Sequence, residues 1–162
     1  MRALRHVFDF GSAKRRFPPA TLDAIQQAIR ASEHAHLGEI VFAVEGTLPL
    51  RDVLRGCSVR ERAQEVFARL RVWDTRRDTG VLVYVLLAER AIEILADRGI
   101  AAKVGADEWR GICALMQGHF AAGDYRQGAL AGVEAITALL ARHFPADGRD
   151  NPDELPDRPV LL

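Results

Sequence analysis

Three aspartates and two arginines lie in polar segments on either side of the most apolar stretch of the chain. Asp74, Arg76 and Asp78 precede this stretch, and Asp97 and Arg98 follow it. Carboxylate oxygens are the ligands that hard cations such as Ca²⁺ and Mg²⁺ prefer. A divalent ion held by the three aspartates, with the two arginines as anion-binding groups, would hold and polarise a phosphoryl group.

The expected strand directions explain why these side chains would meet. The apolar run Val81–Ala88 predicts a buried strand, and the alternating run Ala91–Asp97 predicts an antiparallel partner after a tight turn. Glu39–Glu45 predicts a further strand, parallel to Val81–Ala88 because a helix separates the two. The starts of the parallel strands and the end of the returning strand then share one edge of the sheet.

Three other side chains are expected beside this edge. Glu39 begins the first strand, His36 shortly precedes it, and Trp73 is expected as a hydrophobic plug beneath the charged loop. A structural role is the alternative for the acids, because aspartates in turns often bond their own backbone and neighbouring arginines can neutralise them. No residue is assigned a catalytic role.

Helical patterns occupy most of the remaining chain. Apolar spacing predicts helices after Pro19, after the capping box Ser58-Val-Arg-Glu61, around Trp109 and from about Asp124. The segment between Gly46 and Gly56 is expected to be a loop. This order of elements predicts an α/β fold, a three-layer α/β/α sandwich whose small mixed sheet combines a parallel β-α-β unit with an antiparallel hairpin.

Composition limits the function classes. The 162 residues include 49% hydrophobic and 27% charged side chains, which is typical of a folded domain. Basic and acidic side chains number 22 each, so no basic field for nucleic acid exists and no nucleic-acid partner is expected. Two cysteines without a ligand-like spacing, and no signal-peptide pattern, favour a cytoplasmic location.

Both ends of the chain differ from the middle. Residues 1–16 contain five basic side chains and one acid, which predicts either a solvated arm or weak contact of residues 2–16 with an anionic membrane surface. Residues 145–162 are rich in proline and aspartate and are expected to be a tail. The α/β domain is therefore expected at 17–144.

Two adjoining segments resemble the central hairpin of TPM domains: Gly80-Val-Leu-Val-Tyr-Val-Leu-Leu-Ala-Glu-Arg90 and Ile92-Glu-Ile-Leu-Ala-Asp-Arg-Gly99. The first-strand residues Gly38-Glu39-Ile40-Val41, the Ala63/Phe67 helix and Phe120-Ala-Ala-Gly-Asp-Tyr125 match in the same order. The resemblance implies an α/β sandwich, a phosphatase assignment, and metal binding in some members. Many relatives carry a signal peptide and a membrane anchor, neither of which is expected here, and others have Asn or Asp where this chain has Thr79.

Two functions are compatible with these observations. The first is an accessory or binding module with a divalent-cation or anion site at the sheet edge. Such a module would bind a protein partner, and a membrane-associated protein is one candidate. The alternative, implied by the resemblance, is a metal-assisted phosphatase of low turnover that acts on phosphomonoesters. Either function would use Ca²⁺ or Mg²⁺ at the predicted carboxylates.

Overall fold

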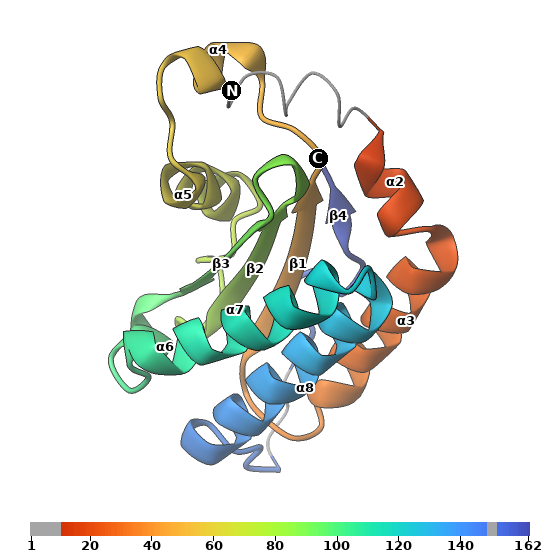
Figure 1. Ribbon diagram of the computed structural model, residues 1–162. Coiled ribbons are helices and arrows are strands. Elements are labelled where there is room, and N and C mark those ends of the chain that lie inside the picture. Colours follow the sequence, from red (N-terminus) through yellow and green to blue (C-terminus); the bar gives the residue numbers. More distant parts are fainter. Residues whose placement is uncertain (1–10, 149–151) are drawn as a thin grey trace.

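The computed structural model describes residues 11–148 and 152–162, and Figure 1 shows helices packed against an open sheet. In chain order the elements are α2 (Ser12–Arg16), α3 (Pro19–Ser32), β1 (Glu39–Glu45), α4 (Leu50–Leu54), α5 (Val59–Arg69), β2 (Gly80–Leu86), the short 3₁₀ helix η1 (Leu87–Glu89), β3 (Ala91–Ala96), α6 (Arg98–Ala101), α7 (Ala106–Ala121), α8 (Tyr125–His143) and β4 (Val160–Leu161).

The sheet has the strand order β3-β2-β1-β4. β1 and β2 are parallel along their whole length, from the pair Glu39 and Gly80 to the pair Glu45 and Leu86. β3 returns antiparallel to β2, so that Ala96 lies opposite Val81. The predicted parallel unit and hairpin are therefore confirmed, and the starts of β1 and β2 and the end of β3 share one edge.

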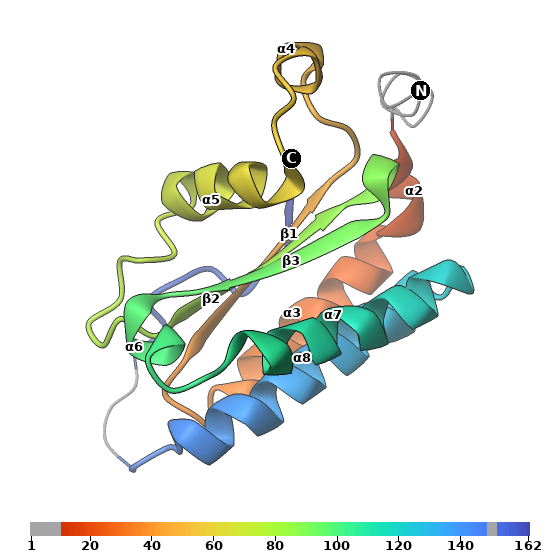
Figure 2. The ribbon, with the colours of Figure 1, turned by 60° about the vertical axis from the view of Figure 1, so that its left-hand side comes forward.

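Alternate side chains of the strands enter two separate cores. Phe42 of β1 and Val83 of β2 pack with α3, α7 and α8, whereas Val41 and Leu82 pack with α5. Figure 2 shows α5 on one face of the sheet and the three longer helices on the other. The three-layer α/β/α prediction is confirmed. Among the described residues, no helix combines the length and the apolar character needed to cross a membrane.

Three details differ from the expectation. The expected loop between Gly46 and Gly56 contains the helix α4, and the turn after β2 contains η1 in place of two residues. Arg90 ends η1 with a positive φ of 52°, in the left-handed region that favours glycine. The C-terminal tail contributes a strand, β4, which runs parallel to β1.

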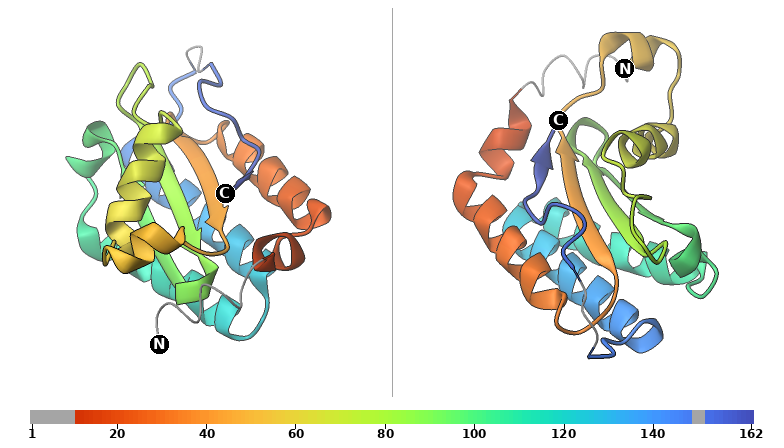
Figure 3. Two further views of the ribbon diagram at one scale, coloured as in Figure 1. Left: turned by 90° about the horizontal axis from the view of Figure 1, so that it is seen from above. Right: turned by 180° about the vertical axis from the view of Figure 1, so that it is seen from behind.

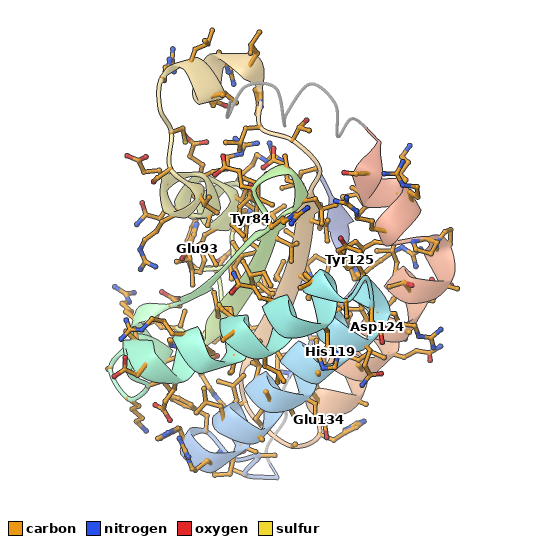
Figure 4. All side chains as sticks on the ribbon, viewed as in Figure 1. Tyr84, Glu93, His119, Asp124, Tyr125 and Glu134 are labelled. Carbon is orange, nitrogen blue, oxygen red and sulfur yellow. The ribbon has the colours of Figure 1, made fainter. Side chains whose placement is uncertain are left out.

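A buried polar cluster joins the sheet to α5. Arg62 donates through Nε and Nη2 to the two carboxylate oxygens of Glu45, over 2.9 and 2.8 Å. The Tyr84 hydroxyl donates to Glu45 over 2.5 Å, and the pKa of this buried hydroxyl is raised by desolvation and by the carboxylate. Figure 4 shows Tyr84 on the central strand. Since Glu45 ends β1, this cluster fixes the end of the sheet opposite the one that carries Glu39.

Replacing Glu45 by glutamine keeps its shape and removes its charge. Because the largely buried Arg62 then loses its main counter-charge, we expect the free energy of unfolding to fall by about 3 kcal/mol, measured by urea denaturation. Glu65→Gln is the matched control, since Glu65 also accepts from Arg62 but its side chain is 57% exposed. The control should change stability by less than about 1 kcal/mol. Equal losses in both variants would contradict this role of Glu45.

Candidate metal site

Three carboxylates from separate segments meet at the edge where β1 begins. Glu33 follows the last turn of α3, Glu39 is the first residue of β1, and Asp153 belongs to the C-terminal segment. One carboxylate oxygen of each lies within 4.8 Å of one oxygen of the other two. The three residues differ in exposure: Glu39 is buried, Glu33 is half-buried and Asp153 is exposed.

The turn between α3 and β1 is held by buried polar contacts. The Gly38 N–H donates to Nδ1 of His36 over 3.2 Å, and the Leu37 N–H donates to the Phe144 carbonyl. His36 is fully buried, and burial lowers its pKa to about 4. The imidazole is therefore neutral at pH 7, and its Nδ1 accepts the hydrogen bond from Gly38. Glu33 and Glu39 are thereby directed to the same edge.

The C-terminal segment folds back along β1, as Figure 3 shows in its right-hand view. Leu155 is buried in the α5-side core, and the Leu162 N–H donates to the Val44 carbonyl over 2.9 Å. Asp157 pairs with Arg30 of α3 over 3.1 Å. These contacts place Asp153 beside the start of β1, so the tail completes the cluster.

Glu39 is the most constrained member of this cluster. The residue is only 3% exposed, and its Oε1 has no hydrogen-bond partner within the part of the chain that the structure describes. Burial raises its pKa to about 7, with a further rise from the negative charge of Asp153. The backbone N–H groups of Leu155 and Glu154 act in the opposite sense. A buried carboxylate oxygen without a partner is costly, which makes this atom a candidate cation ligand.

The pKa values of the other two carboxyl groups are also raised. The pKa of Glu33 is raised to about 8, first by burial and then by its hydrogen bond with Asp157 and the surrounding acids. The pKa of Asp153 is raised by burial and by Asp157, against the opposing effect of Arg30. Several acids, among them Asp157, therefore raise one another's pKa values here, with Arg30 opposing the effect. Such an arrangement is relieved either by shared protons or by a cation.

Two of the predicted site aspartates, Asp78 and Asp97, share Arg98 as a partner, whereas Asp74 pairs with Arg71. Asp74 accepts from Arg71 over 2.5 Å, and Asp78 forms an ion pair with Arg98 over 3.0 Å. Asp97 caps α6 by accepting from the Arg98 N–H over 2.8 Å, while its Oδ2 is buried without a partner. Among the described residues these three do not form a cluster like that at Glu39. A cation bound by Asp74, Asp78 and Asp97 stays a prediction.

The remaining predicted residues lie either at the carboxylate cluster or in the loop before β2. Glu39 lies in the carboxylate cluster, with His36 in the turn that precedes it. The Arg76 N–H donates to Glu154, next to Asp153, over 3.0 Å, so the exposed Arg76 lies near the cluster. The prediction that Trp73 is a buried plug is wrong, because Trp73 is 50% exposed beneath the Arg71 guanidinium. Its loop is filled instead by the fully buried Val72.

The sequence analysis missed Glu33 and Asp153. Glu33 follows a helix end and lies six residues before Glu39, a spacing that marks a short turn and gives no sign of convergence. Asp153 lies in the segment that was expected to be a tail outside the domain. The apolar ending Val160-Leu-Leu162 is the one signal that could have placed this segment on the sheet.

The fold and the carboxylate edge define a class of α/β sandwich proteins with a mixed open sheet, and comparison identifies the family. The TPM domain family matches residues 14–139. The NMR structure of BA42 protein from the psychrophilic bacterium Bizionia argentinensis is similar, with 32% identity and a TM-score of 0.78 over 88% of this chain and 93% of that one. No curated protein matches the sequence. The chain belongs to the TPM domain family.

Proposed function

We propose that this TPM domain is a binding module with a divalent-cation site formed by Glu33, Glu39 and Asp153. The observation that carries the proposal is the Oε1 atom of Glu39, which is buried, has no hydrogen-bond partner among the described residues and lies in reach of two other carboxylates. Oxygen-only donors favour a hard cation. Ca²⁺ fits this set better than Mg²⁺, because it tolerates irregular geometry whereas Mg²⁺ requires a near-ideal octahedron.

The proposed cation would have a structural effect in addition to its charge. Its ligands come from the end of α3, the start of β1 and the C-terminal segment. Neutralising the crowded carboxylates would tie this last segment to the sheet edge, where Glu154 and Asp157 already bond to neighbouring elements. The surface that the segment forms beside β1 would then depend on the cation. This dependence supports an accessory role in which the domain presents the surface to a partner.

A cytoplasmic location and a membrane-associated partner are further parts of this proposal. Support for the latter comes from Lys14, Arg15 and Arg16, which lie on α2. Arg2 and Arg5, which the sequence analysis joined to them, lie outside the described residues. A basic cluster of this kind would attract anionic lipid headgroups.

Calorimetric titration with CaCl₂ tests the cation site. We expect binding with release of protons at pH 7, since the raised pKa values of Glu33 and Glu39 mean that both groups are partly or mostly protonated without the ion. Affinity should therefore increase from pH 6 to pH 8. Glu39→Gln, which removes one anionic ligand, should weaken binding by at least about tenfold.

Glu65→Gln is the matched control for this titration, because Glu65 is an exposed acid that pairs with Arg62 at the end of the sheet opposite the cluster. Its affinity for Ca²⁺ should equal that of the natural chain. Absence of binding at millimolar Ca²⁺, or equal binding by Glu39→Gln, would refute the site.

Hydrolysis of phosphomonoesters is the second candidate function, and the position of Arg76 favours it. This exposed arginine, held through its N–H beside Asp153, would allow a phosphate to contact a cation and a guanidinium together. Under this alternative, Ca²⁺- or Mg²⁺-dependent hydrolysis of p-nitrophenyl phosphate should be lost in Glu39→Gln. If Asp74→Ala and Asp97→Ala abolish it instead, the aspartates of the sequence prediction form the site. Equal background rates in all four proteins favour the accessory role.

A further inference from the structure

A cavity of about 500 Å³ lies at the end of the sheet opposite the carboxylate cluster. It is bordered by α2, by the turn that joins β2 to β3, and by the junction of α7 with α8. Val85–Leu87, which end β2 and begin η1, form one wall, whereas Glu39 marks the other end of the parallel strands. This volume is in the range of cavities that hold small organic molecules.

Two arginines from distant parts of the sequence line this cavity. Arg16 belongs to α2, and its guanidinium carbon lies 5.3 Å from the centre of the Tyr125 ring. Arg90 lies in the turn, where its N–H donates to the Leu87 carbonyl over 3.0 Å. None of the described residues that line the cavity is acidic. The lining therefore favours an anion.

The backbone at Arg90 strengthens this interpretation. Its φ of 52° belongs to the left-handed region, where glycine or asparagine would be less strained. The side chain is exposed, and among the described residues no carboxylate forms an ion pair with it. An arginine at this strained, exposed position brings a positive charge to the cavity without a structural partner that explains it.

Aromatic side chains form a second part of the cavity wall, on which the apolar part of a ligand would pack. The Phe120 and Tyr125 rings lie 5.0 Å apart, and Phe17 contacts Tyr125 edge-on with centroids 5.8 Å apart. Figure 4 shows Tyr125 at the junction of α7 and α8, facing α2. The largely buried Leu87 also borders the cavity. A ligand with an apolar body would pack on this wall while its charge faced the arginines.

We propose that the cavity binds a small organic anion, in which a carboxylate or phosphate-type head contacts Arg16 and Arg90 and a flat or short apolar body packs on Phe120 and Tyr125. Guanidinium groups bind such heads through paired charge-assisted hydrogen bonds. Head and body recognition both contribute, because the lining combines the two arginines with apolar and aromatic side chains. The site shares no residue with the carboxylate cluster.

Calorimetric titration with phenylphosphonate, which cannot be hydrolysed as a phosphate ester, tests this site. We expect it to bind at least about tenfold more tightly than inorganic phosphate, which lacks the body, or benzyl alcohol, which lacks the charge. Arg16→Gln and Arg90→Gln should each weaken phenylphosphonate binding by about tenfold or more. Arg126→Gln is the matched control, because Arg126 follows Tyr125 on α8 but does not line the cavity.

A second variant separates ligand binding from folding. Ala121→Leu adds bulk at the exposed rim of the cavity and should weaken binding while leaving the thermal midpoint unchanged. Glu39→Gln and a chelator should leave phenylphosphonate binding intact, which distinguishes this site from the proposed cation site. Absence of binding at millimolar ligand, or binding that neither arginine variant weakens, would overturn the proposal. Arginine-dependent binding to anionic lipid vesicles alone would also overturn it and would indicate membrane contact instead.

Discussion

The edge of the sheet where β1 begins depends on how the negative charge of the Glu39 carboxylate is balanced. Glu39 is 3% exposed, and the negative charges of Asp153 and Glu154 act on it. Burial disfavours the charged form, the backbone N–H groups of Leu155 and Glu154 favour it, and Arg30 of the same edge pairs with Asp157. Protons balance the charge in part, as the raised pKa values indicate. A divalent cation would balance it more fully and would hold three segments together at once.

The layers of the fold were predictable because they follow from local patterns. The all-apolar middle of Glu39–Glu45 and the run from Val81 fit strands buried on both faces, and the Ser58–Glu61 capping box is present as expected. The two-residue β4 was not predicted, since two apolar residues carry no periodicity and the short apolar ending is its one signal in the sequence. Its place on the sheet comes from tertiary contacts such as that of Leu155.

The candidate site was predictable only where sequence order fixes position. Glu39 was expected at the correct sheet edge because it begins a strand of known direction. Asp74, Asp78 and Asp97 were expected to share one cation. Asp78 and Asp97 both contact Arg98 and Asp74 pairs with Arg71, so the shared cation stays a prediction. Glu33 and Asp153 could not be found in this way, because their meeting depends on a tail that folds back over 127 residues of chain to pair with Arg30.

The central claim is that a cation at Glu39 fixes the C-terminal segment to β1. Amide hydrogen exchange at Leu162, whose N–H donates to the Val44 carbonyl, tests it most directly when measured with Ca²⁺ and with a chelator. The account predicts that Ca²⁺ slows this exchange in the natural chain and leaves it unchanged in Glu39→Gln. Identical exchange in the natural chain under both conditions would contradict it.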